Sequence, residues 1–64
     1  GPGETLTVTL PDESKVTLNA SSVLTYEENG WNSNRWVSLS GEAFFEVTPG
    51  KAFKVIGGFY EIKV

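Results

Sequence analysis

The sequence predicts an all-β fold, namely a small antiparallel meander, roll or sandwich of about 6–7 short strands. Three observations support this prediction. Apolar and polar residues alternate with period two in nearly every segment, and short clusters of Pro, Gly, Asn, Asp and Ser separate the alternating runs. No segment has the i, i+3, i+4, i+7 apolar spacing that an amphipathic helix requires.

The first half of the chain contains three predicted strands. Residues 5–10, "TLTVTL", place Leu6, Val8 and Leu10 on one face and three threonines on the other. The turn "PDES" at residues 11–14 leads into a second strand, "KVTL", and the break "NASS" leads into a third strand, "VLTY".

The second half begins with a polar loop over residues 27–34 and then contains four predicted strands. These cover residues 35–39, 42–47, 52–56 and 59–64. Gly57-Gly58 is the strongest two-residue hairpin signal in the chain, so the last two strands are expected to pair with each other.

A short motif recurs as "VTLPDES", "VTLNASS" and "VSLSGEA", starting at Val8, Val16 and Val37. The offset of eight residues between the first two copies fits strand-turn-strand units that lie side by side. Chance similarity among alternating β sequences is the alternative explanation, and the fold prediction does not depend on the repeat.

Length and charge narrow the possible functions. The chain has 64 residues, no Cys, no His and a net charge of −3. Nucleic acid is an unsuitable partner because Lys and Arg dominate that affinity. No apolar run approaches the length of about 20 residues that crosses a bilayer, so a membrane anchor is expected only outside this segment. Residues 1–3 are interpreted as a cloning remnant or disordered lead, and residues 4–64 as the β domain.

The sequence predicts no enzyme, no catalytic residue, no metal site and no cofactor. Without histidine, no serine has the usual activating base. Glu42 and Glu46 share a strand face but lie roughly 13 Å apart along it. Glycosidase carboxylates need about 5–9.5 Å. The glutamates are therefore interpreted as a solvated strand face.

Four residues are candidates for binding a protein partner: Trp31, Arg35, Trp36 and Phe44. The first three belong to "GWNSNRW" and are of types enriched at interface hot spots. Phe44 lies with Glu42 and Glu46 on the outer face of its strand. Alternatively, the tryptophans cover the open end of a small core, and a loop or second layer covers Phe44. A carbohydrate-binding module that stacks sugars on exposed tryptophans is a further alternative.

Several segments of the chain resemble the FecR domain in its Bacteroidetes-like form. The family pattern runs Leu-Pro-Asp-Gly-Ser, Val-x-Leu-Asn-Ala-x-Ser, Leu-x-Tyr, Arg-x-Val-x-Leu-x-Gly-Glu-Ala-x-Phe-x-Val and Pro-Phe-x-Val. The matching segments here are residues 10–14, 16–22, 24–26, 35–47 and 53–55. The segment from Arg35 to Val47 is the most specific. Glu13 replaces the family glycine, which makes a positive-φ turn less favourable.

The resemblance implies a signalling role. It implies the periplasmic part of an anti-sigma regulator that is anchored in the inner membrane and senses a TonB-dependent transporter. The expected partners are that transporter's signalling domain or the remainder of the protein's own chain. A Leu-Gly-Thr-x-Phe-x-Val strand expected after Val64 is absent, so the segment is expected to be the N-terminal part of a larger domain. Its open strand edge is expected to favour self-association.

Overall fold

The computed structural model describes residues 4–64, and the lead predicted at residues 1–3 lies outside the described residues. The described residues form seven strands and no helix, which confirms the all-β prediction. The strands are β1 (Thr5–Thr9), β2 (Lys15–Asn19), β3 (Val23–Tyr26), β4 (Arg35–Ser40), β5 (Glu42–Glu46), β6 (Phe53–Ile56) and β7 (Phe59–Lys63).

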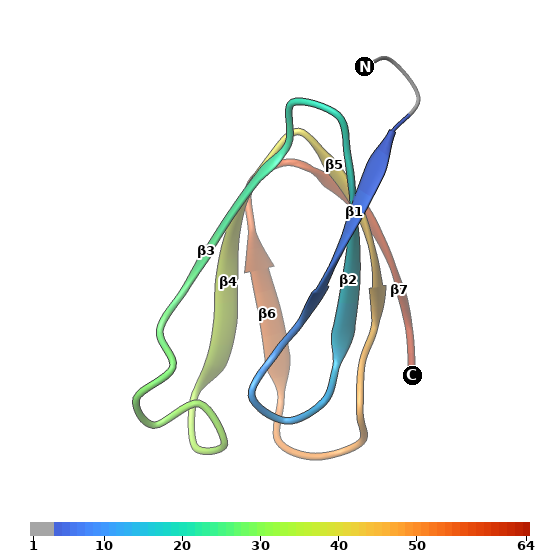
Figure 1. Cartoon of the computed structure of the whole chain (residues 1–64). Helices are drawn as coiled ribbons and strands as arrows, with labels where there is room; N and C mark the ends of the chain where they lie inside the picture. Colours follow the sequence, from blue (N-terminus) through green and yellow to red (C-terminus); the bar gives the residue numbers. More distant parts are fainter. Residues whose placement is uncertain (1–3) are drawn as a thin grey trace.

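The strands form two facing sheets (Figure 1). One sheet has the order β1-β2-β5-β7 and the other has the order β3-β4-β6. Both sheets are mixed, because β4 pairs with β6 and β5 pairs with β7 in parallel. The purely antiparallel arrangement predicted from the sequence is therefore wrong for these two pairs.

The β1–β2 hairpin follows the predicted turn closely. The Glu13 N–H donates to the Leu10 carbonyl at 2.9 Å, and the Leu10 N–H donates to the Ser14 carbonyl at 2.7 Å. Glu13 itself has a φ of 70°. This is the three-residue hairpin loop that ends in a left-handed residue, a position that favours glycine. The positive φ that the sequence made less favourable is thus kept, with a glutamate in place.

The repeat predicted neighbouring strands correctly for its first two copies. Val8 lies opposite Val16 in the β1–β2 pair. The third copy, which begins at Val37, lies in β4 of the other sheet.

Glycines turn the chain from one sheet to the other at two corners. Gly41 has a φ of 101° and joins β4 to β5. Gly57 and Gly58 have φ values of 78° and 67° and join β6 to β7. The hairpin predicted at Gly57-Gly58 is wrong, because β6 and β7 lie in different sheets. The unit β4–corner–β5 and the unit β6–corner–β7 lie side by side and run in the same direction. Their strands therefore pair in parallel, β4 with β6 and β5 with β7.

A serine closes the first corner. The Ser22 hydroxyl donates to the Glu42 carbonyl at 3.0 Å and accepts from the Glu42 N–H at 2.9 Å. A Cβ atom on Gly41 would collide with the Ser22 side chain. Glycine is therefore required here both by its φ and by the close approach of Ser22.

The core lies between the sheets and follows the period-two pattern. Its most buried members are Leu10, Val16, Leu18, Trp31, Val37, Leu39, Ala43, Phe45 and Val47. Leu6 has the predicted orientation but remains 63% exposed near the start of edge strand β1.

Candidate functional site

The four predicted partner-binding residues do not form one surface. Trp31 and Arg35 are buried, Trp36 is half-buried and Phe44 is exposed.

Trp31 belongs to the core rather than to an exposed platform. Its side chain is 2% exposed. Its ring packs edge-to-face against Tyr26 at 5.6 Å and against Phe53 at 5.8 Å between centroids. The position matches the alternative in which a tryptophan covers the end of a small core. It leaves no face on which a sugar ring can stack.

Arg35 joins three segments of the chain in the interior. Its Nη1 atom donates to Asp12 Oδ2 and to the Thr48 carbonyl, both at 2.7 Å. Its Nε atom donates to the Lys51 carbonyl at 2.9 Å, and Nη2 donates to the same carbonyl. The guanidinium carbon also lies 5.7 Å from the centre of the Phe53 ring. The planar, five-donor group of arginine suits this multiple role, which lysine cannot reproduce.

The carboxylate that faces Arg35 is held in its ionised form. Burial alone would raise the pKa of Asp12, but hydrogen bonds from Arg35 and from the Ser14 N–H outweigh burial and lower it to about 2. The Trp31 indole N–H helps lower this pKa but makes no hydrogen bond of normal geometry among the described residues. The Arg35 guanidinium therefore faces a carboxylate that is ionised at neutral pH, and the two opposite charges compensate each other.

The network around Arg35 fastens the β1–β2 turn to the connection between β5 and β6. Ser14, which is fully buried, adds a further link by accepting a hydrogen bond from the Thr48 N–H at 2.9 Å. A partner cannot reach a 6% exposed arginine without opening this end of the sandwich. Arg35 therefore stabilises the fold by holding the β1–β2 turn against the β5–β6 connection.

Trp36 and Phe44 point away from the core on opposite sides of the sandwich. Trp36 alternates with the buried Arg35 and Val37 in β4, so it lies on the outer side of the three-stranded sheet. Phe44 alternates with the buried Ala43 and Phe45 in β5, so it lies on the outer side of the four-stranded sheet. One partner contact of ordinary size cannot cover both.

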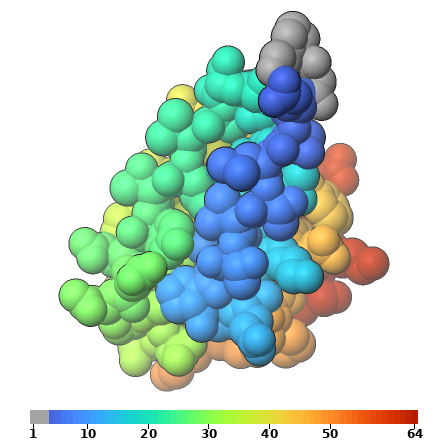
Figure 2. All heavy atoms as spheres, viewed as in Figure 1, coloured from blue at the N-terminus to red at the C-terminus, as the bar shows by residue number. Residues whose placement is uncertain are grey.

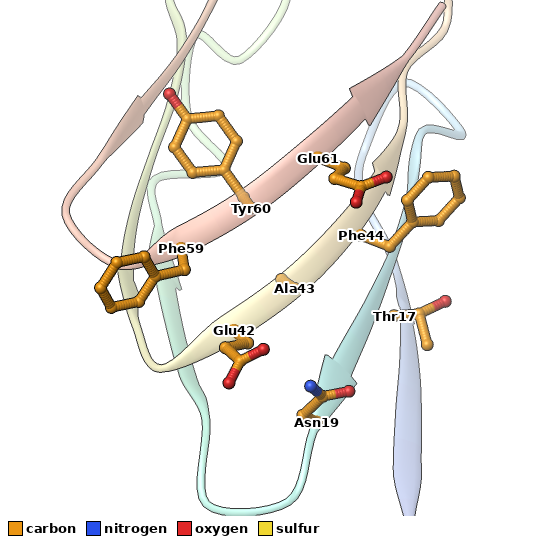
Figure 3. A pocket seen from close by; sticks show the side chains of 8 residues that line it. All are labelled: Thr17, Asn19, Glu42, Ala43, Phe44, Phe59, Tyr60 and Glu61. Carbon is orange, nitrogen blue, oxygen red and sulfur yellow. The ribbon is translucent and has the colours of Figure 1, made fainter.

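The side of the four-stranded sheet that carries Phe44 is here called the outer face. Its outward residues on β2, β5 and β7 are Lys15, Thr17, Asn19, Glu42, Phe44, Glu46, Phe59, Glu61 and Lys63. Part of it is hollowed into a shallow depression of about 370 Å³, shown in Figure 3.

Two phenylalanines and two glutamates alternate around this depression. Phe59 lies opposite Glu42, and Glu61 lies opposite Phe44 in the parallel β5–β7 pair. Figure 3 shows the two rings on either side, with the carboxylates between them. Phe59 is 79% exposed and Phe44 is 37% exposed. Phe44 is thus uncovered by the described part of the chain, and Phe59 joins it as an exposed aromatic that sequence reasoning missed.

The sequence predicts correctly that Phe59 lies on an outward strand face, but the expected β6–β7 hairpin pairs that strand with the wrong neighbour. Period two places Phe59 with Glu61 and Lys63 on one face. The pairing of β7 with β5, rather than with β6, brings that face beside Phe44.

The described residues contain no group of three or more His, Cys, Asp or Glu side chains arranged to hold a metal ion. Within residues 4–64 there is also no membrane-spanning helix.

The described residues form a small β-sandwich whose four-stranded sheet exposes two phenylalanines beside two glutamates. The FecR protein family model matches residues 1–64, and the chain therefore belongs to the FecR family. This confirms the resemblance drawn from the sequence. Neither the curated proteins nor the solved structures provide a match. FecR proteins are membrane-anchored signalling regulators with a periplasmic part, and the family is regulatory rather than enzymatic.

Proposed function

We propose that this chain is a periplasmic signal-transduction module of a FecR-like anti-sigma regulator. It acts by protein–protein binding in cell-surface signalling linked to TonB-dependent transport. Its parent protein is anchored in the inner membrane. The partner is the signalling domain of the transporter or the remainder of the regulator's own chain.

The observation that carries this proposal is the family match along the whole chain. The outer face supports it physically. Large apolar side chains exposed together on a sheet are typical of interaction surfaces, and aromatic residues are enriched at the centres of protein interfaces. Phe44 and Phe59 satisfy both conditions.

The charges on the outer face indicate what the partner presents. Glu42 and Glu61 border the two rings. A complementary partner therefore carries an apolar side chain that fits between the phenylalanines, with Lys or Arg beside it. Association with such a partner becomes slower and weaker as salt is added, because exposed charges are screened.

No observation favours the carbohydrate-binding alternative. It required two exposed tryptophans, and Trp31 is buried while Trp36 is half-buried. We do not retain it.

The test is a calorimetric titration of this chain with the periplasmic signalling domain of a TonB-dependent transporter, and separately with the remainder of the regulator's periplasmic part. Phe44→Ala and Phe59→Ala are each expected to weaken binding by about tenfold or more, as for an aromatic hot spot. Leu6→Ala is the matched control, because Leu6 is also an exposed apolar strand residue but lies in β1.

Circular dichroism of each variant separates loss of binding from loss of folding. The proposal is overturned if neither partner binds the folded wild-type chain. It is also overturned if Phe44→Ala and Phe59→Ala bind as tightly as Leu6→Ala.

A further inference from the structure

β7 is an edge strand of the four-stranded sheet, and the backbone groups on its outer side have no neighbouring strand among the described residues. β7 is the last strand of its sheet, and every residue in it is exposed. Figure 2 shows the C-terminal atoms, in red, protruding at the margin of the molecule beside β5. We propose that two copies of this chain associate by antiparallel pairing of their β7 strands, with Ile62 on the two-fold axis. This inference does not depend on the proposed function.

The backbone of β7 is oriented for this pairing. The Phe59 N–H donates to the Gly41 carbonyl, and the Lys63 carbonyl accepts from the Val47 N–H, so the odd-numbered residues of β7 face β5. Backbone groups alternate in direction along a strand. The N–H and C=O groups of Tyr60 and Ile62 therefore point to the free edge. In the proposed register Ile62 lies opposite Ile62 of the second copy, and each donates to the other.

The inner side of β7 carries apolar residues with incomplete cover. Tyr60 is 46% exposed, Ile62 is 41% exposed and Val64 is 82% exposed. Tyr60 packs edge-to-face on the buried Phe45 ring at 6.0 Å, so this row continues the hydrophobic core toward the edge. The proposed register places Tyr60 opposite Val64 of the second copy, and the core is extended across the two-fold axis.

The charges select this register over its neighbours. With Ile62 on the axis, Glu61 lies opposite Lys63 of the second copy, and symmetry produces the pair twice. These are non-hydrogen-bonded positions, where side chains approach most closely. A register centred on Glu61 places two glutamates opposite each other, and one centred on Lys63 places two lysines opposite each other. Like charges directly opposite are destabilising.

The same register continues an alternation already present on the outer face. Lys15 lies opposite Glu46, and Glu46 lies opposite Lys63, across β2, β5 and β7. Glu61 of the second copy extends this row with the next negative charge. Lysine on an edge strand ordinarily discourages edge pairing. Here the second copy neutralises Lys63, so that protection is lost.

Charge reversal tests the register directly. Sedimentation equilibrium over micromolar to millimolar concentrations is expected to show a weak wild-type dimer. Glu61→Lys and Lys63→Glu each place like charges opposite each other at both symmetry-related pairs. Each is therefore expected to weaken dimerisation by about tenfold or more. An equimolar mixture of the two variants restores opposite charges at both pairs, so the mixture is expected to dimerise as tightly as wild type.

Lys15→Glu is the matched control. It makes the same charge change and also removes a lysine opposite Glu46, but it lies on β2, away from the edge. Its dimerisation constant is expected to stay within about threefold of wild type, because its altered charge is not across the dimer axis. Ile62→Pro is a second probe. It removes an N–H that points away from β5 and is expected to abolish the dimer while the fold persists.

Four results would overturn the proposal. Two concern the wild-type chain: it is monomeric at every concentration, or it dimerises with a constant that neither charge reversal changes. The mixture of the two reversed variants can fail to recover dimerisation. Finally, Lys15→Glu can weaken the dimer as much as Lys63→Glu, which would indicate nonspecific charge effects.

Discussion

Replacing Arg35 with methionine tests whether the buried ion pair holds this end of the sandwich together. Methionine keeps most of the side-chain volume but removes the charge and all the hydrogen bonds to Asp12, Thr48 and Lys51. Asp12 then remains as a nearly buried carboxylate, because its side chain is 10% exposed in the pair. We expect Arg35→Met to destabilise the domain.

The magnitude follows from the cost of an unpaired buried charge. Breaking a buried pair by removing one partner costs about 3–5 kcal/mol. Asp12 lies in a turn near the surface and can regain some water, so we expect the lower part of this range, about 3 kcal/mol. At about 0.05–0.15 kcal/mol per residue, the whole domain is worth only about 3–10 kcal/mol. The change therefore removes a large share of the stability.

Urea denaturation at pH 7, followed by tryptophan fluorescence, measures this loss. Trp31 is a suitable reporter because it packs on Phe53, which also lies beside the Arg35 guanidinium. Arg35→Lys keeps the charge but loses the fork of donors, so about half of the loss is expected. Combining Arg35→Met with Asp12→Asn is expected to be less destabilising than the sum of the single changes, because no unpaired carboxylate is left. A loss below about 1 kcal/mol for Arg35→Met, or strict additivity with Asp12→Asn, would refute the reasoning.

Three further predictions concern stability. Glu13→Gly is expected to raise the free energy of unfolding by about 0.5–1 kcal/mol in urea denaturation, since it relieves a left-handed glutamate at φ 70°; an unchanged or lower value contradicts this. Because the pKa of Asp12 is lowered from 3.8 to about 2, its stabilising contribution is complete above pH 4 and is lost as the pH falls toward 2. Between pH 4 and pH 2 the free energy of unfolding should fall by about 1–2 kcal/mol more for the wild type than for Asp12→Asn. Equal decreases would contradict a stabilising role for the ionised Asp12. Gly58→Ala is expected to destabilise by at least about 2 kcal/mol in the same assay, because a Cβ atom there lies 2.6 Å from Leu39 Cγ at a φ of 67°; a neutral result would show that the corner can relax.

Local alternation predicted the strands well, because a strand that buries one face has apolar residues at every second position. All seven strands begin and end within one residue of the predicted ranges, and Val8 and Val16 pair as the repeat indicated. Pairing between distant strands is not a local property. Gly57-Gly58 supplies positive φ values equally well to a hairpin and to a corner between sheets, and only the parallel pairing of β6 with β4 decides between them.

The candidate contact residues show the same limit. Composition identified Trp31 and Arg35 as unusual, but it could not distinguish an interface from a buried cluster. The partners that bury Arg35 lie 13 to 23 residues away in the sequence. Phe44 was placed correctly on the outer face, because that placement depends only on alternation within β5. Phe59 was missed because its neighbour across the sheet is Glu42 of β5, which the expected β6–β7 hairpin concealed.

The most direct test of the central claim is an NMR titration of the labelled chain with the periplasmic signalling domain of a TonB-dependent transporter. The claim is that the outer face of the four-stranded sheet binds a protein. It predicts that shifted amide signals cluster on Thr17, Phe44, Phe59 and Glu61, while Trp36 on the opposite surface is unaffected. Shifts that cluster around Trp36, or signals that do not move at saturating partner concentrations, would contradict it.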